Sequence, residues 1–151
     1  MSQKKVRLHK GLSHKEVAKV AEQTLASRGY KGPQPGDTMP DGTKLAGISP
    51  DTRKTMYTTP ADAPNLMSLR DAERYAQTLE DHGHKDWRLP SQAELQVLYD
   101  NRAAIGGFEG KDYWSSGTWG KAGLGAWGHD FASGKPKRYL NLETYSLRCV
   151  R

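Results

Sequence analysis

The side chains that could perform chemistry are few, and they are scattered along the chain. His82, His84 and Asp86 alternate, a spacing that can aim two imidazoles the same way, but no third metal ligand follows nearby. Ser115 and Ser116 have no His and Asp at a recognisable spacing for nucleophilic catalysis. We therefore predict no catalytic residue, no metal site and no cofactor, and we expect that the protein is not an enzyme.

Recognition by large side chains is the second kind of chemistry that the sequence indicates. Aromatic and arginine side chains are the usual anchors of binding surfaces, and loops on a rigid scaffold commonly carry such residues. The C-terminal third is rich in them. The predicted ligand-binding residues are Trp119, Lys121, His129, Arg138, Tyr139, Asn141 and Tyr145. The alternative is that several of these residues only cover the core.

Other large or charged residues are expected to be structural. Four aromatic residues are assigned to the core: Trp87, Trp114, Trp127 and Phe131. Arg88 and Arg148 stand beside core positions on predicted strands. We expect them to form structural ion pairs with the carboxylates of Glu94, Asp112 or Asp130.

One stretch, residues 86–95, organises the elements around it. Pro90 restrains Leu89 to an extended conformation, so a short strand is predicted to end there. Ser91 and Glu94 have the spacing of a capping box, which predicts that a helix begins directly afterwards. Leu95 and Leu98 then recur at helical spacing and give this helix its apolar face.

The remaining elements follow from turns and from hydrophobic spacing. Residues 45–48 and 54–59 are predicted to form a hairpin, because turn residues separate two short β-favouring runs. Ser68 is a good N-cap for a second helix, with an apolar face from Leu69 to Leu79. Four further strands are predicted at residues 113–116, 126–131, 138–140 and 145–150, with a glycine-rich loop at 117–125.

The N-terminal arm carries the whole excess of positive charge. Residues 1–35 hold eight basic and two acidic residues, whereas the rest of the chain is neutral. Ser13 and Glu16 form a second predicted capping box, which starts one amphipathic helix that ends near Gly29. We therefore divide the chain into a basic arm with a Pro/Gly linker, residues 1–36, and a main domain, residues 37–151.

Composition limits the cellular context. A single cysteine, Cys149, excludes an intrachain disulfide. No apolar run reaches the roughly 18 residues that a membrane-spanning helix needs, and no apolar segment of a signal peptide follows the N-terminus. We therefore expect no membrane association and no signal peptide.

Four motifs recur together in a known family. They are Trp87-Arg88-Leu89-Pro90 with Glu94-Leu95; Tyr113-Trp114-Ser115-Ser116; Ala126-Trp127 with Phe131 and Gly134; and the closing Leu147-Arg148-Cys149-Val150-Arg151. Over residues 37–151 the chain resembles the domain named after the C-terminal region of the Legionella collagen-like protein, a domain of unknown function. The resemblance implies the formylglycine-generating branch of the C-type lectin-like fold. Its fold class is α+β, with two helices packed on a small twisted antiparallel sheet and long loops.

Two activities of related proteins are not expected here. A formylglycine-generating oxidase needs paired cysteines for copper, and the chain has one cysteine. Calcium-dependent sugar-binding lectins use Glu-Pro-Asn, Gln-Pro-Asp and Trp-Asn-Asp motifs, which are missing from the sequence.

The resemblance implies a binding or structural module, because members occur in bacterial surface proteins and in phage virion proteins. We expect a phage tail, collar, decoration or fibre protein, located in the virion or in the cytoplasm before assembly. Its domain would present a loop surface to a protein or glycan receptor, and its arm would attach it to other subunits, with a homo-oligomer as a further expectation. The alternatives are a variable ligand-binding protein of a diversity-generating retroelement, and a nucleic-acid-associated protein that uses the basic arm.

Overall fold

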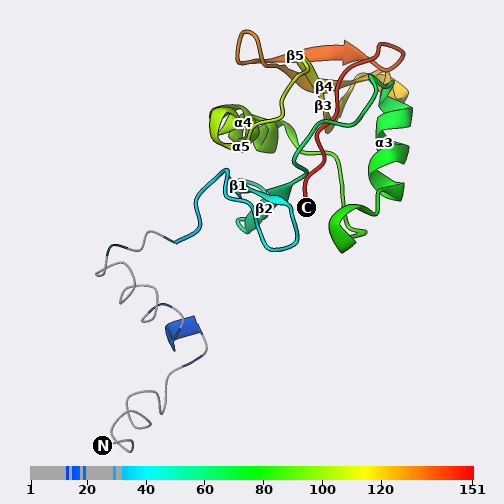
Figure 1. Ribbon diagram of the computed structural model, residues 1–151. Helices are drawn as coiled ribbons and strands as arrows, with labels where there is room; N and C mark the ends of the chain where they lie inside the picture. Colours follow the sequence, from blue (N-terminus) through cyan, green and yellow to red (C-terminus); the bar gives the residue numbers. More distant parts are fainter. Residues whose placement is uncertain (1–12, 14, 18, 20–28, 30–31) are drawn as a thin grey trace, which may run out of the picture. The chain divides into compact units, whose positions relative to one another are not determined.

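The computed structural model describes residues 13, 15–17, 19, 29 and 32–151, and the chain divides into two compact units, Met1–Gln34 and Pro35–Arg151 (Figure 1). In the first unit the predicted capping box is present. The Ser13 N–H donates to Glu16 Oε2 at 3.0 Å, and the Glu16 N–H donates to Ser13 Oγ at 3.2 Å. Most of the helix predicted up to Gly29 lies outside the described residues.

The second unit begins with the predicted hairpin. Strands β1 (Lys44–Ile48) and β2 (Thr55–Thr58) pair antiparallel, with a bulge between Leu45 and Gly47. Gly47 adopts a φ of +136°, and a Cβ built on it would lie 2.9 Å from Val97 Cγ1. The missing side chain therefore lets the hairpin approach the helix that carries Val97.

Three strands form the second sheet, in the order β3 (Asp112–Trp119), β4 (Gly125–Asp130) and β5 (Lys135–Leu140). The predicted strands at 113–116, 126–131 and 138–140 are thus confirmed. The glycine-rich loop is shorter than predicted, because β3 continues through an irregularity and pairs Trp119 with Gly125. Only residues 120–124 remain at the hairpin tip, which contains the 3-10 turn η2 (Lys121–Gly123).

The two predicted helices are present, and a short third helix follows the second. Helix α3 (Leu69–Thr78) begins after Ser68, whose side chain accepts a hydrogen bond from the Asp71 N–H. Helix α4 (Gln92–Asp100) begins with the complete capping box that the sequence predicts. The remaining helical segments are α5 (Arg102–Ile105) and the 3-10 turn η1 (Asp81–Gly83). In the described part of the chain, no helix has the length and apolar character needed to cross a membrane.

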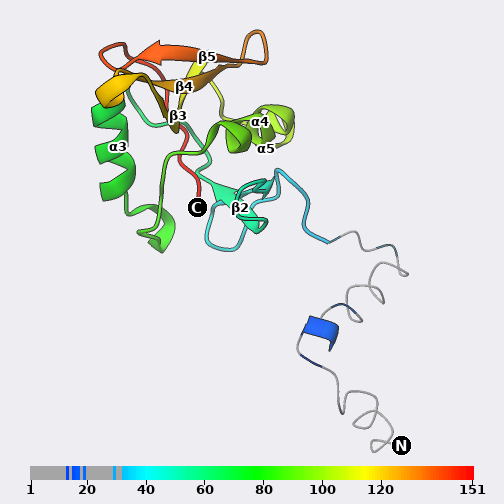
Figure 2. The ribbon, with the colours of Figure 1, turned by 180° about the vertical axis from the view of Figure 1, so that it is seen from behind.

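Two apolar cores lie on opposite sides of β3. Figures 1 and 2 show α3 on one side of the sheet and α4 with α5 on the other. Neighbouring residues of a strand point to opposite faces, so Trp114 enters the α3-side core and Tyr113 enters the α4-side core. Both side chains are completely buried. A three-stranded sheet with one helix layer on each side therefore forms the centre of an α+β domain.

The sequence predicts a last strand at residues 145–150, and this prediction is wrong, because the segment does not form a regular strand. The segment is extended, but its isolated bridges reach four separate places, at Met67, Tyr113, Thr58 and Arg88. The Arg151 N–H also donates to the Tyr57 carbonyl at 2.9 Å. No continuous ladder forms, because successive residues of this segment pair with different parts of the fold.

Candidate ligand-binding face

Three large side chains meet on an exposed part of the β3–β4–β5 sheet. Trp127 of β4 lies directly opposite Arg138 of β5, and Trp119 of β3 lies opposite Gly125. The Arg138 guanidinium carbon is 5.2 Å from the centre of the Trp119 ring and 5.6 Å from that of Trp127. Arg138 is exposed and both tryptophans are partly exposed. We call these three residues the Trp–Arg face.

Local contacts hold the Trp–Arg face in place. The Trp119 indole N–H donates to the Tyr139 carbonyl at 3.0 Å. Since β4 lies between β3 and β5, this hydrogen bond holds the indole ring across β4. A Cβ on Gly125 would lie 2.8 Å from the same indole nitrogen, so only glycine leaves room for the ring. Each cation–π contact contributes about 0.5–1 kcal/mol at an exposed site. These contacts hold the aromatic and cationic groups in fixed positions relative to one another.

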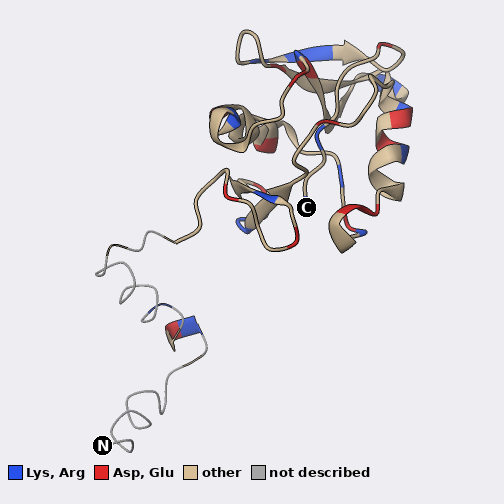
Figure 3. Cartoon of the chain, in the orientation of Figure 1, with Lys and Arg blue, Asp and Glu red and all other residues tan. Residues whose placement is uncertain are grey.

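Apolar side chains extend the Trp–Arg face, whereas the lysines of β5 alternate with Arg138 and lie on the opposite face of the sheet. Leu140 lies two residues after Arg138, on the same face of β5, and is 47% exposed. Leu124 at the hairpin tip is 48% exposed. Figure 3 shows the basic residues along β5, where Lys135 and Lys137 are both exposed. On the opposite face of β5 the Lys137 ammonium lies 2.9 Å from the Asp130 carboxylate, and on the Trp–Arg face the Arg138 guanidinium lies over the two tryptophan rings. The Trp–Arg face thus combines apolar area with the positive charge of Arg138.

Two of the predicted ligand-binding residues are buried, so their predicted exposure is wrong. His129 is 1% exposed and packs under α4, with its ring centre 5.3 Å from Tyr99 and 5.5 Å from Phe131. Tyr139 is 5% exposed in the α3-side core, where its hydroxyl donates to Asp112. Burial, the nearby Asp112 carboxylate and other negative charges raise the pKa of the Tyr139 phenol.

The other predicted residues divide into surface and structural positions. Lys121 is exposed at the hairpin tip. The Asn141 amide donates to the Gly123 carbonyl at 3.0 Å and so ties the end of β5 to that tip. Tyr145 stacks on Tyr139 at 4.0 Å between ring centres, and burial raises its pKa to about 12. The structure therefore brings Trp119 and Arg138 together and gives Asn141 and Tyr145 structural contacts.

The sequence predicts that Trp127 lies in the core, and this prediction is wrong. It is partly exposed, since its neighbours Ala126 and Gly128 face the α3-side core. Strand alternation supplied the signal: a small buried residue on each side of a tryptophan indicates that the tryptophan points the other way.

The buried charges of the domain act as structural pairs. Arg88 forms the expected pair with Glu94, at 2.6 Å. Burial opposes ionisation of Glu94, but hydrogen bonds from Arg88, the Ser49 hydroxyl and the Ser91 N–H lower its pKa to about 2. For Arg148 the expected partners are wrong, because it pairs with Asp62 at 3.1 Å.

The two alternating histidines both contact Asp41, and Asp86 takes part in a separate ion pair. The His84 Nε2 lies 2.7 Å from an Asp41 carboxylate oxygen, and the His82 Nδ1 lies 3.0 Å from the Asp41 carbonyl. Asp86 instead accepts from the Arg151 guanidinium at 2.7 Å. Among the described residues, no group of three or more His, Cys, Asp or Glu side chains is placed to hold a metal ion.

Comparison with known proteins supports the resemblance stated above. A search of curated proteins finds no match. The Lcl C-terminal domain family matches residues 47–151, which include the Trp–Arg face and the buried residues of both cores except Ala46. This match covers more than half of the chain, so the chain belongs to the Lcl C-terminal domain family.

Proposed function

We propose that the domain is a non-enzymatic binding module, and that the Trp–Arg face is its binding surface. The observation that supports this function is the exposed stack of Arg138 between Trp119 and Trp127, at 5.2 and 5.6 Å. Trp and Arg are the residue types that most often anchor interfaces. Their positions on paired strands reduce the ordering cost that binding would otherwise carry.

The ligand class proposed is a protein or glycan displayed on a surface. Within that class the composition of the face favours a protein, because partly exposed tryptophans beside exposed leucines match the core of a protein interface. We also propose a C-type lectin-like fold of the formylglycine-generating branch for the domain. The helix layers on both sides of a small antiparallel sheet and the extended C-terminal segment agree with it.

A role as a phage virion component is proposed from the family resemblance. In this role the arm would attach the protein to the particle, and several copies would compensate for a weak single contact through multivalency. Retroelement-diversified ligand binding remains the alternative within the same fold. It predicts a near-identical template repeat beside the gene that differs at adenines.

The test is binding of the full chain to arrays of bacterial surface proteins and of glycans. For the proteins or glycans that the wild type binds, Trp127→Ala and Arg138→Ala should each weaken binding at least about tenfold, as expected for interface anchors. Lys135→Ala is the matched control, because it removes an exposed cation of the same strand outside the stack, and it should change binding less than about twofold.

Three results would contradict the proposal. One is a ligand whose binding is unchanged by both Trp–Arg variants. Another is full retention of binding by Arg138→Ala together with loss in Lys135→Ala. The third is binding of DNA alone, with a steep salt dependence and complete loss on removal of residues 1–36, which would assign the function to the basic arm.

A further inference from the structure

A pocket separate from the Trp–Arg face lies between α3, η1 and the segment that follows β2. Its volume is about 350 Å³, at the lower end of the range for small-molecule sites. The lining residues are Thr59, Pro60, Ala61, Asp62, Ala63, Pro64, Tyr75, Leu79, Asp81, His82 and Cys149. Two of them are acidic and none is Lys or Arg, so no lysine or arginine of the pocket wall supplies a positive counter-charge.

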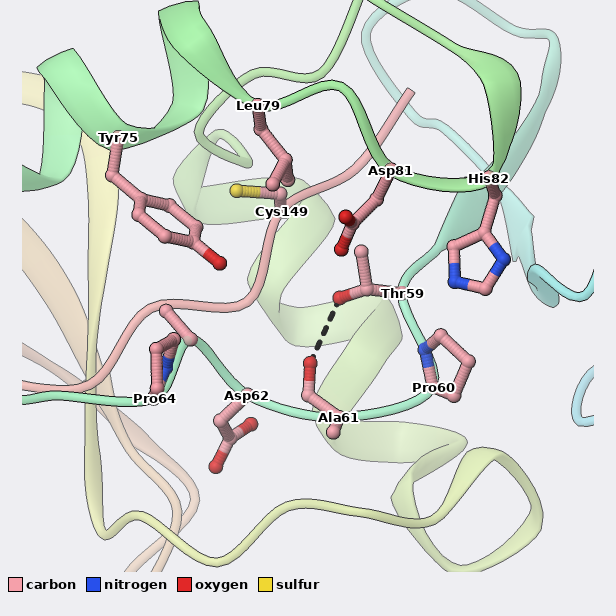
Figure 4. Close-up of a pocket in the computed structure, with 11 residues that line it drawn as sticks. Thr59, Pro60, Ala61, Asp62, Pro64, Tyr75, Leu79, Asp81, His82 and Cys149 are labelled. Carbon is pink, nitrogen blue, oxygen red and sulfur yellow. Dashed lines mark hydrogen bonds between the residues drawn. The ribbon is translucent and has the colours of Figure 1, made fainter.

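The Asp81 carboxylate is the main charged group of the pocket. Figure 4 shows it pointing into the same space as the Tyr75 hydroxyl. Its backbone is fixed, since the Asp81 carbonyl accepts from the Trp87 indole N–H and from the His84 N–H, both at 3.0 Å. Within the described part of the chain, no donor is hydrogen-bonded to the Asp81 carboxylate or to the Tyr75 hydroxyl. The other acid, Asp62, is compensated by Arg148.

The polar atoms around this space can accept hydrogen bonds, and the Tyr75 hydroxyl can also donate one. The Thr59 hydroxyl donates its proton to the Ala61 carbonyl at 2.9 Å, so its lone pairs remain for a ligand. The His82 Nδ1 faces the Asp41 carbonyl at 3.0 Å, which favours a proton on that nitrogen and leaves Nε2 as an acceptor. The complementary ligand group therefore carries several N–H donors and a positive charge, as an ammonium does.

The rest of the pocket suits an aliphatic chain. Leu79 and Cys149 form one wall in Figure 4, and Pro60 and Pro64 lie opposite them. Burial and the Asp81 charge raise the pKa of the Cys149 thiol to about 12, so this sulfur is an uncharged wall and not a nucleophile. The Tyr75 ring adds an aromatic face that attracts a cation.

We propose that this pocket binds a primary ammonium group on a short aliphatic chain, as found in a lysine side chain of a partner or in a free diamine. Asp81 pairs with the ammonium, the oxygens of Tyr75 and Thr59 accept its remaining protons, and the apolar wall covers the methylenes. The site shares no residue with the Trp–Arg face, so its failure would leave the proposed function intact.

The experiment measures binding of n-butylamine to the full chain by chemical-shift titration at neutral pH. We expect about millimolar affinity, because the ligand has only five heavy atoms, with shifts at Tyr75 and Cys149. Asp81→Asn should weaken binding at least about tenfold, since a charge-assisted hydrogen bond is lost. Glu80→Gln is the matched control: it neutralises the adjacent carboxylate, which lies outside the pocket and near Lys85, and should leave binding unchanged.

Two ligand variants sharpen the test. n-Butanol keeps the chain without the charge, and n-butyltrimethylammonium keeps the charge without the N–H donors. Both should bind at least about tenfold more weakly than n-butylamine. Equal binding of either ligand would overturn the proposal, and so would equal affinities of Asp81→Asn and Glu80→Gln, or shifts confined to residues outside the pocket.

The source of the amine is separated by two further probes, cadaverine and a short acetylated peptide with one central lysine. Tighter binding of the peptide assigns the pocket to a lysine of a partner protein, and tighter binding of cadaverine assigns it to free diamines. Binding of neither probe, at concentrations that saturate with n-butylamine, would overturn the proposal.

Discussion

Loss of the Asp62 carboxylate should destabilise the domain more than any other single charge change, and Asp62→Asn is the sharpest perturbation. Asp62 accepts four hydrogen bonds, from the Arg148 Nε at 3.1 Å, the Tyr113 hydroxyl at 2.8 Å and the N–H groups of Glu109 and Gly110 at 3.0 and 3.2 Å. An asparagine has one acceptor oxygen, and its NH₂ group would face donors. The guanidinium of Arg148, which is completely buried, would lose its counter-ion.

The expected cost of Asp62→Asn is about 3–5 kcal/mol, the typical effect of removing one partner of a buried ion pair. This is a large part of the roughly 5–15 kcal/mol by which a domain is stable. The Thr59 and Gly106 carbonyls still accept from Arg148, at 2.9 and 3.1 Å, but they carry no full charge. Arg148→Met in the Asp62→Asn background should recover part of the loss, because it removes the stranded cation.

Urea unfolding of the full chain followed by tryptophan fluorescence gives the free energies, provided that the slope m stays constant. Asp86→Asn is the matched control. It makes the same substitution in an exposed pair with Arg151, at 2.7 Å, and should cost no more than about 1 kcal/mol. Equal losses in the free energy of unfolding for Asp62→Asn and Asp86→Asn would refute this reasoning. So would a loss in the double variant Asp62→Asn/Arg148→Met that exceeds the sum of the losses of its two single variants.

Three further predictions concern stability. Burial lowers the pKa of His129 below its ordinary value of 6.5, so the stability that the neutral imidazole contributes above pH 6.5 is lost as the pH falls below 6.5. When the pH is lowered from about 7 to about 5, the urea midpoint of the wild type should therefore fall, and that of His129→Leu should fall much less. Equal slopes of the midpoint against pH in the two proteins would contradict this. Glu94→Gln should lower the free energy of unfolding at pH 7 by about 2–3 kcal/mol, measured by urea unfolding. It should also remove the loss of stability that the wild type shows as the pH falls from 4.5 to about 2, because the pKa of Glu94 in the folded state is lowered to about 2. Gly128→Ala should lower the melting temperature by more than about 10 °C, since its Cβ would overlap the Tyr139 ring. Gly117→Ala, whose Cβ would meet no atom nearer than 3.6 Å, should change the melting temperature by less than about 3 °C.

Local signals in the sequence predicted the elements well. The capping box of Ser91 and Glu94 spans four residues, so its hydrogen bonds form whenever that segment is helical, and the structure contains both. The hairpin of residues 44–58 and the three strands of the main sheet follow from turns and alternation that are likewise local. The Arg88–Glu94 pair was also predictable, because only six residues separate the two.

Contacts between distant segments were not predictable in the same way. Arg148 and Asp62 are 86 residues apart, and Asp62 stands in a segment that carries no helix or strand signal. The closing residues 145–150 have the composition of a strand, yet the bridges of Tyr145, Ser146 and Val150 reach different segments. Nothing in their own sequence encodes this, since the partners are set by how the other elements pack.

The sequence by itself determined most helices and strands of the main domain and the family resemblance, and it placed the large aromatic and cationic residues of the candidate face in the C-terminal third. The tertiary structure alone decided which of those residues reach the surface. Trp127 and His129 occupy the same face of β4, but α4 covers His129 and leaves Trp127 partly exposed. The reason is physical: strand alternation assigns a side chain to a face, and only the packing of other elements determines how much of that face is covered.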